Sequence, residues 1–254
     1  MWDPEVYLAF DDHRGRPFYD LLARVPAKNP RAVVDIGCGP GNLTADLPRR
    51  WPDARITGFD SSAEMVAAAV ERGVDARVAD VRDWTPEPGT DVLVCNAVLQ
   101  WVPGHEDLLE RWVRALDSAA WIAFQVPGNF DAPSHRAIRE LAAEQPWRTR
   151  LSGLGLRGAD TVAEPARYAE LLLEAGCEVD VWETTYQQRL HGADPVLDWV
   201  RGTALRPIAE ALDEREFTEF RAQLAPRLRA AYPALHDGST LFAFRRIFAV
   251  ARVG

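Results

Sequence analysis

Short apolar segments alternate with longer amphipathic ones from residue 32 to residue 126. The short segments have the length of buried strands, and the segments between them repeat their apolar positions at helical spacing. We therefore predict strands at 32–36, 55–59, 75–78, 92–95 and 121–126. The helices predicted between them lie at 42–50, 63–72 and 107–116. Strands that alternate with helices in this way indicate a parallel sheet covered on both faces.

The pattern changes on either side of this alternation. Residues 3–25 predict one or two short helices, broken near Gly15-Arg16-Pro17. Beyond the fifth strand we predict a helix at 166–174, a strand at 178–186, two or three helices over 194–233 and a last strand at 241–251. This order predicts one α/β, Rossmann-like domain with seven mostly parallel strands and an antiparallel last strand. Its expected parts are an N-terminal helical lid over 1–30, a core over 31–129 and helical cap insertions over 130–176 and 187–240.

Composition is that of a folded protein, and it excludes several classes. The chain has 254 residues and a net charge of −9, which argues against general affinity for nucleic acid or anionic membranes. We find no leader segment and no apolar stretch of spanning length, so a cytoplasmic location is expected. The three cysteines lie far apart and without clustered histidines, so we predict neither a disulfide nor a metal site. We expect Cys38, Cys95 and Cys177 to be buried as small apolar residues.

The first predicted strand leads directly into a glycine-rich turn, Gly37-Cys38-Gly39-Pro40-Gly41-Asn42. Glycines at these positions let the backbone turn tightly and approach a ligand closely. A dinucleotide loop has the spacing GxGxxG, whereas this loop has GxGxG with asparagine at position 42. The spacing predicts S-adenosylmethionine (SAM) as the cofactor, and with it a class I methyltransferase fold. The contacts expected from this segment are Asp35, Gly37, Gly39 and Gly41.

Polar residues at the ends of the second and third strands extend the predicted cofactor site. Asp60 is expected to accept hydrogen bonds from the ribose hydroxyls, with Ser61 beside it. An N-cap role for Asp60 is the alternative, although Ser61 or Ser62 can fill that role. After the third strand, Asp80 is expected to accept from the exocyclic amine of adenine, and the Val81 N–H to donate to its ring.

The fourth strand ends in Asn96-Ala97, followed by Leu99-Gln100-Trp101-Val102-Pro103. Backbone carbonyls at Asn96 and Ala97 are expected to accept from the ammonium group of the cofactor. Trp101 either flanks the methyl group or fills the core, and the sequence leaves both interpretations open.

The chain resembles the trans-aconitate 2-methyltransferase family over essentially its whole length. The matching segments are Tyr7-Leu8-Ala9-Phe10, Arg14-Gly15-Arg16-Pro17, 35–42, 99–103, Gln125-Val126-Pro127-Gly128-Asn129, 174–182, Leu205-Arg206-Pro207 and Arg246-Ile247-Phe248. The departures are His13, Gly128 and Ala204, which stand where the family often has glutamate, aspartate and glycine. These departures concern the assignment of the substrate and not the assignment of the fold.

This resemblance implies SAM-dependent formation of a monomethyl ester of trans-aconitate, a small tricarboxylate, with S-adenosylhomocysteine as the other product. A carboxylate is ionised at neutral pH and can attack a methyl group without a general base. We find no His–Asp dyad, and the scattered histidines are expected to be structural or on the surface. Three carboxylates require cations, and Arg16, Arg206 and Arg246 are expected to converge at the mouth of the cofactor cleft.

Three further residues have roles that only the resemblance suggests. Gln125 and Tyr186 are candidates for positioning the substrate, and Tyr7 for binding the cofactor's carboxylate.

Two alternatives remain open for the function. One is methylation of another small molecule, such as a phenol, an amine or a quinone. The other is a regulator that binds SAM without consuming it.

Overall fold

The computed structural model describes residues 11–254, with side chains from residue 15 onward. The chain divides into two compact units. The first comprises the described residues up to Pro127 together with Val162–Thr184 and Arg246–Gly254. The second comprises Gly128–Thr161 and Thr185–Arg245. The polypeptide therefore passes between the units four times.

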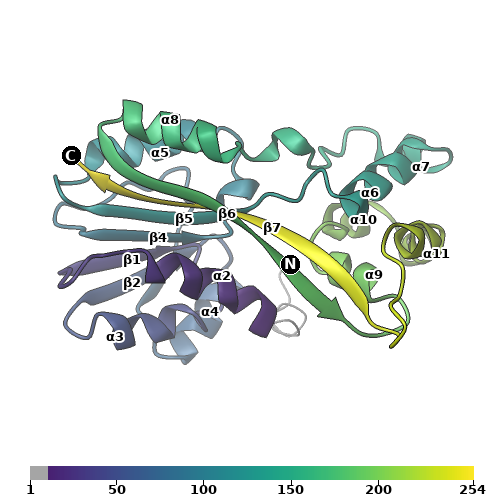
Figure 1. Cartoon of the computed structure of the whole chain (residues 1–254), viewed down its shortest axis with the longest axis horizontal. Coiled ribbons are helices and arrows are strands. Elements are labelled where there is room, and N and C mark those ends of the chain that lie inside the picture. The colour runs from purple at the N-terminus through teal and green to yellow at the C-terminus, as the bar shows by residue number, and fades with distance from the viewer. Residues whose placement is uncertain (1–10) are drawn as a thin grey trace. The chain divides into compact units, whose positions relative to one another are not determined.

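A seven-stranded sheet forms the centre of the first unit (Figure 1). Its strands are β1 (Ala32–Ile36), β2 (Arg55–Asp60), β3 (Ala76–Val78), β4 (Val92–Asn96), β5 (Trp121–Pro127), β6 (Cys177–Leu190) and β7 (Thr240–Val253). They follow the order β3-β2-β1-β4-β5-β7-β6. Strands β1 to β5 pair in parallel, and β7 pairs antiparallel with β5. The predicted sheet of seven mostly parallel strands with an antiparallel last strand is confirmed.

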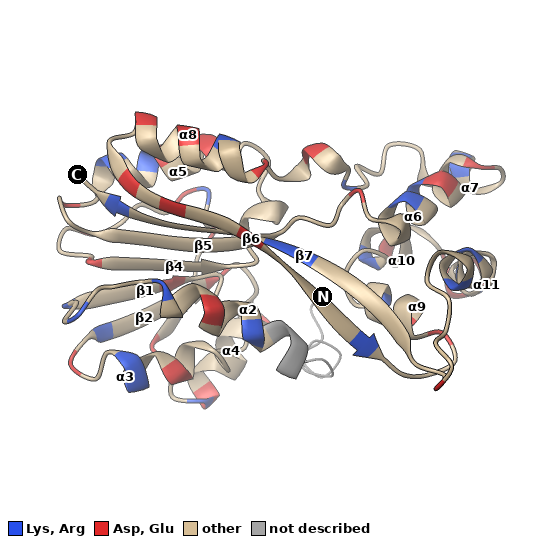
Figure 2. Cartoon of the chain, viewed as in Figure 1, with Lys and Arg blue, Asp and Glu red and all other residues tan. Residues whose placement is uncertain are grey.

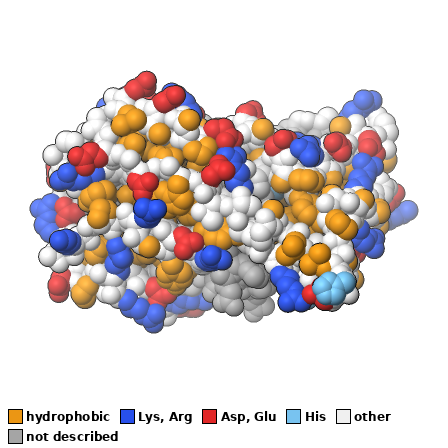
Figure 3. Space-filling view, in the orientation of Figure 1, with side chains coloured by type: hydrophobic (Ala, Val, Ile, Leu, Met, Phe, Trp, Pro, Cys, Tyr) orange, Lys and Arg blue, Asp and Glu red, His pale blue; other side chains and the backbone are white. Residues whose placement is uncertain are grey.

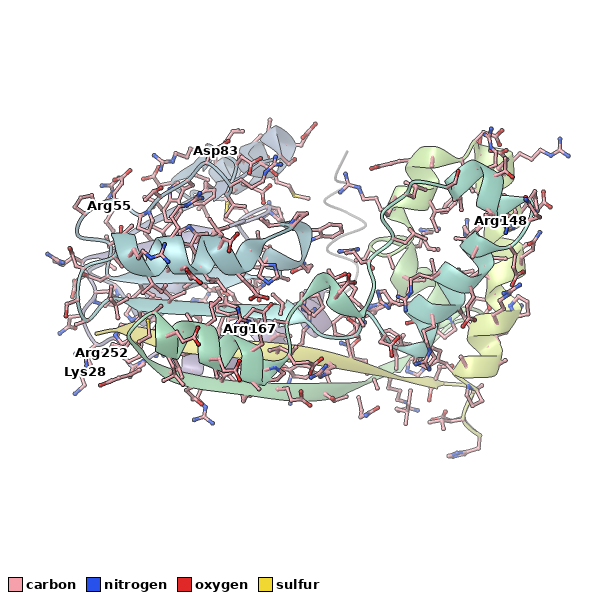
Figure 4. The ribbon with its side chains drawn as sticks, turned by 90° about the horizontal axis from the view of Figure 1, so that it is seen from above. Lys28, Arg55, Asp83, Arg148, Arg167 and Arg252 are labelled. Carbon is pink, nitrogen blue, oxygen red and sulfur yellow. The ribbon has the colours of Figure 1, made fainter. Side chains whose placement is uncertain are left out.

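Helices cover both faces of this sheet. Those of the first unit are α2 (Asp11–Ala23), α3 (Leu47–Arg50), α4 (Ala63–Glu71), α5 (His105–Ala115) and α8 (Pro165–Glu174). The strand order runs in opposite directions from β1, so right-handed crossovers place α3 and α4 on one face and α5 on the other. Helix α8 lies beside α5 (Figure 1). Its side chain Arg167, labelled in Figure 4, donates to Glu106 of α5 at 3.0 Å.

Helix α2 corrects the sequence prediction of a break near Gly15-Arg16-Pro17. The helix is continuous through this segment, with Pro17 inside it. Phe18 and Leu21 are fully buried, and burial of this apolar face outweighs the hydrogen bond that proline removes. Residues 3–10 of the predicted segment lie outside the described residues.

The unit boundaries also differ from the predicted insertions. The first predicted cap insertion, 130–176, included α8, whereas α8 belongs to the first unit. The inner face of α8 carries three buried side chains, Tyr168, Leu171 and Leu172. Their burial keeps α8 packed beside α5. The predicted helix at 42–50 is a 3-10 turn at Thr44–Asp46 followed by α3.

The second unit is mainly helical. It contains α6 (Pro133–Ala143), α7 (Trp147–Leu151), α9 (Pro195–Arg201), α10 (Arg206–Ala211) and α11 (Glu214–Ala231), together with the outer ends of β6 and β7. A capping box of Asp213 and Glu216 starts α11, and Phe220, Leu224 and Leu228 form its buried face. Acidic and basic residues are interspersed over the elements of both units (Figures 2 and 3).

The three cysteines are free and buried, as predicted. Within residues 11–254, no helix combines the length and the apolar character needed to cross a membrane.

Candidate active site

The glycine turn follows β1 at the carboxyl edge of the sheet. Gly37, Gly39 and Gly41 have φ angles of +68°, +55° and +77°. A Cβ on Gly41 would lie 2.8 Å from the Ala69 Cβ of α4, so only glycine lets the loop pack on that helix. A Cβ on Gly39 would meet no atom within 4 Å, so the loop has open space over it there. This open side is where a ligand can approach the backbone.

Asp60 at the tip of β2 is held against this loop. The Gly39 N–H donates to Asp60 Oδ2 at 3.1 Å, and the Ser62 N–H donates to Asp60 Oδ1 at 2.9 Å. Ser62 also caps α4, because its hydroxyl accepts from the Met65 N–H at 3.3 Å. The capping role therefore falls to Ser62, and Ser61 is exposed. Each carboxylate oxygen of Asp60 has a second lone pair to offer, as a ribose anchor requires.

Asp35 is buried at the end of β1, with 3% of its surface exposed. The Thr44 hydroxyl donates to its Oδ2 at 2.6 Å. Burial raises the pKa of Asp35 to about 7, the charge of Asp60 adds to the rise, and the Thr44 hydrogen bond opposes it. A buried carboxylate with a raised pKa is stabilised by a nearby cation, so this group fits the ammonium of SAM. Thr44 was not predicted, although a hydroxyl two residues beyond the glycine turn was visible in the sequence.

Asp80 follows β3 and carries a partner that the sequence did not predict. The Arg82 guanidinium donates to both carboxylate oxygens, from Nη2 to Oδ2 at 2.5 Å and from Nε to Oδ1 at 2.9 Å. These bonds and the Arg82 N–H hold the pKa of Asp80 down at about 2. Asp80 is thus a fixed carboxylate, and its contact with adenine, like that of Val81, stays a prediction.

The end of β4 is shaped by Asn96 and Ala97. Ala97 has a left-handed φ of +58°, which is strained for a residue with a Cβ. Its N–H donates to the Gln125 carbonyl at 2.9 Å, and its carbonyl accepts from the Gln100 side chain. These two bonds hold the strained turn in place. Trp101 follows it in a 3-10 turn (Leu99–Trp101) with 39% of its surface exposed, so it does not fill the core.

Arg246 in β7 is 7% exposed and lies two register positions from Gln125 of β5. Its Nη1 donates to Gln125 Oε1 at 3.2 Å. Gln125 is 1% exposed and donates in turn from Nε2 to Asn96 Oδ1 at 2.6 Å. The structure therefore brings together two predicted substrate residues and one predicted cofactor residue.

The remaining predicted residues are distributed over both units. Arg16 in α2 is exposed and lies 3.8 Å from Asp20. Arg206 and Tyr186 belong to the second unit. Arg206 Nε lies 2.9 Å from Glu210 Oε1 within α10. Tyr7 lies outside the described residues, and the convergence of the three arginines stays a prediction.

His105 is the histidine closest in sequence to the end of β4. Its Nε2 lies 2.7 Å from the Tyr168 hydroxyl and its Nδ1 lies 3.2 Å from the Val102 carbonyl. Burial lowers the pKa of this imidazole and so favours its neutral form. Both ring nitrogens are engaged within the protein, which agrees with the expected structural role.

Comparisons with known proteins identify the family. Residues 33–119 match the family model described as a methyltransferase domain. A protein of Rhodococcus jostii (strain RHA1) named trans-aconitate 2-methyltransferase is 62% identical, over 100% of both chains. A protein of the same name from Mycolicibacterium gilvum (strain PYR-GCK) is 60% identical, over 100% of this chain and 99% of that one. The chain belongs to the trans-aconitate 2-methyltransferase family.

Solved structures show that this family member has the class I methyltransferase fold, as predicted. A putative methyltransferase from Bacillus halodurans C-125 has a TM-score of 0.55 at 16% identity, over 93% of this chain and 98% of that one. Geranyl diphosphate C-methyltransferase from Streptomyces coelicolor A3(2) has a TM-score of 0.54 at 15% identity, over 99% of this chain and 83% of that one. At these identities the likeness extends to the fold alone.

Proposed function

We propose that this enzyme transfers the methyl group of SAM to one carboxylate of trans-aconitate and forms a monomethyl ester. The observation that carries the proposal is the 62% identity, over both full lengths, with a relative named for that substrate. The similarity extends well beyond residues 33–119, into the segments that the general methyltransferase model does not cover. A cytoplasmic location is part of the proposal, and the free buried cysteines fit a reducing compartment.

The residues at the carboxyl edge of the sheet fit the cofactor. Asp60 would accept from its ribose, Asp80 and Val81 would hold its adenine, and Asp35 with the Asn96 carbonyl would face its ammonium group. When bound, the cofactor supplies a methyl group on a positively charged sulfur, which leaves as a neutral thioether.

The chain's own task is to bind and orient the acceptor. A carboxylate is already ionised at neutral pH, so no protein base has to take a proton from it. Positioning two reactants in a near-attack geometry is worth roughly 7–11 kcal/mol. Trp101, partly exposed beside the end of β4, would exclude water from the methyl group.

A transfer assay with tritiated SAM tests the proposed function. We expect base-labile label in trans-aconitate and much less in a monocarboxylate, a phenol and an amine of similar size. Label in a neutral acceptor but not in the tricarboxylate would replace the proposed substrate. Binding of S-adenosylhomocysteine without transfer to any small acid would indicate a regulator.

Asp60→Ala is expected to weaken S-adenosylhomocysteine binding at least tenfold. The variant loses hydrogen bonds from the ribose to a charged group, each worth about 1.5–3 kcal/mol. Calorimetric titration measures the dissociation constant. Ser62→Ala is the control, since it removes the hydroxyl that caps α4 and donates to Glu64 but keeps the Ser62 N–H that donates to Asp60, so it should lower stability by about 1 kcal/mol with the affinity retained. An unchanged affinity in Asp60→Ala would remove this residue from the cofactor site.

Arg206→Lys is expected to lower kcat/KM for trans-aconitate about tenfold while leaving S-adenosylhomocysteine affinity unchanged. Lysine keeps the charge but lacks the planar fork that binds a carboxylate through two hydrogen bonds. Glu210→Ala is the control, because it removes the exposed ion-pair partner of Arg206 and should change kcat/KM little. If the two variants behave alike, Arg206 does not bind the acceptor directly.

A further inference from the structure

Three side chains form a continuous hydrogen-bonded series across neighbouring strands of the first unit. Arg246 of β7 donates to Gln125 of β5, and Gln125 donates to Asn96 at the end of β4. Asn96 and Gln125 are register partners, and Pro127 pairs with Arg246, so the three residues share one face of the sheet. Arg246 and Gln125 are both more than nine-tenths buried.

The arginine sets the direction of this series. A guanidinium only donates hydrogen bonds, so the atom of Gln125 that faces Arg246 must be its oxygen. The amide nitrogen of Gln125 then faces Asn96, and the atom of Asn96 that faces it must be the oxygen. The Asn96 amide nitrogen then faces away from Gln125 and can donate to another group. Without the arginine, both amides are free to adopt the opposite orientation.

Asn96 is placed beside the glycine turn. Cys95 pairs with Ile36, so Asn96 and Gly37 are the next residues of two adjacent parallel strands. Asn96 is only half-buried, whereas the other two members of the series are buried. The backbone of Gln125 also holds the strained turn after Asn96, through the bond from the Ala97 N–H. The half-buried end of the series is therefore a fixed hydrogen-bond donor at the carboxyl edge of the sheet, beside the glycine turn.

We propose that Arg246 and Gln125 are positioning residues that orient Asn96, so that its Nδ2 donates to a carboxylate of the acceptor. This inference rests on the proposed function, since it takes the acceptor to be a carboxylate. A carboxylate accepts hydrogen bonds and never donates them, so a donor fixed at this point favours it over an ammonium group. The buried positive charge of Arg246 polarises the series and strengthens the terminal donor.

Gln125→Glu tests the direction of the series. The new carboxylate can still accept a hydrogen bond from Arg246. Unlike the glutamine amide, it cannot donate to Asn96. Asn96 must therefore turn its amide nitrogen toward residue 125 and its oxygen away from it. We expect KM for trans-aconitate to rise more than tenfold, with S-adenosylhomocysteine affinity unchanged and thermal stability retained through the Glu–Arg pair.

Gln125→Leu is the matched variant. It removes the contact without forcing Asn96 to turn, so KM should rise less than in Gln125→Glu, although stability should fall more because Arg246 loses an acceptor. A purely structural role for Gln125 predicts the reverse order, with leucine harming turnover more than glutamate. That order would overturn the proposal, and so would a loss of S-adenosylhomocysteine affinity that equals the change in KM.

A binding measurement on the unaltered protein separates this inference from the proposed function. In the complex with S-adenosylhomocysteine, the side-chain amide resonances of Asn96 are expected to shift when trans-aconitate is added, and not when a neutral triester is added. Resonances that do not move while the tricarboxylate is methylated would refute the role of Asn96 and leave the proposed function intact. Absence of methylation in the wild-type protein would refute the function itself.

Discussion

Asp35→Asn is expected to stabilise the ligand-free protein at pH 8 and to destabilise it near pH 4. The pKa of Asp35 is about 7 in the folded protein against 3.8 for an ordinary aspartate, because the carboxyl group is buried. The folded state therefore binds a proton more tightly than the unfolded state does. The resulting stabilisation is complete below pH 4 and is lost as the pH rises through 7. Three pKa units correspond to about 4 kcal/mol.

Asparagine is neutral at every pH, so it avoids this loss, but its buried amide nitrogen costs about 1–3 kcal/mol. Urea unfolding of both proteins between pH 4 and pH 9 measures the difference, which should change sign across this range. Thr44→Val is the matched control, since it removes the hydrogen bond that opposes the pKa shift and should destabilise more at pH 8 than at pH 4. A difference between wild type and Asp35→Asn that does not vary with pH would show that Asp35 does not titrate in this range.

Gly41→Ala is expected to lower the free energy of unfolding by about 2–5 kcal/mol. Its left-handed φ of +77° costs an alanine about 1–2 kcal/mol, and the new Cβ would lie within 3 Å of both the Cα and the Cβ of Ala69. Because one of these atoms is backbone, α4 itself has to move. The loop and the helix should separate, and S-adenosylhomocysteine affinity should fall with stability.

Gly73→Ala is the matched comparison for this prediction. Gly73 has a φ of +83°, and a Cβ there would meet nothing within 4 Å. Only the backbone cost of about 1–2 kcal/mol should remain. Equal losses in the two variants, measured by urea unfolding, would show that the contact with Ala69 adds nothing.

The central parallel strands β1, β4 and β5 could be predicted from the sequence, because they are largely buried and apolar. Strands β1 and β4 appear within one residue of their predicted bounds, and most of their residues are buried. The long strand β6 was predicted only in part, as 178–186, because its exposed positions are polar and its outer end continues into the second unit. The continuity of α2 was missed, since local signals from glycine and proline carry no information about the burial of Phe18 and Leu21.

In the candidate site too, local features could be predicted from the sequence and contacts between side chains could not. The glycine turn and Asp60 are local in sequence, so spacing was enough to select them. The hydrogen bonds from Thr44 to Asp35 and from Arg82 to Asp80 depend on side-chain geometry, which the spacing of residues in the sequence does not reveal. The sequence assigned Arg246 and Gln125 to the substrate and Asn96 to the cofactor, and only the pairing of three strands shows that the three side chains contact one another.

The bond from Arg246 to Gln125 joins residues 121 positions apart. All of the second unit lies between them in sequence, so this contact closes a very large loop, and such closures are slow and entropically costly. During synthesis, β1 to β5 are complete long before β7 leaves the ribosome, and β5 waits with one edge unpaired. The nascent chain therefore carries its glycine turn well before Arg246 can donate to Gln125 and complete the hydrogen-bonded series that ends at Asn96.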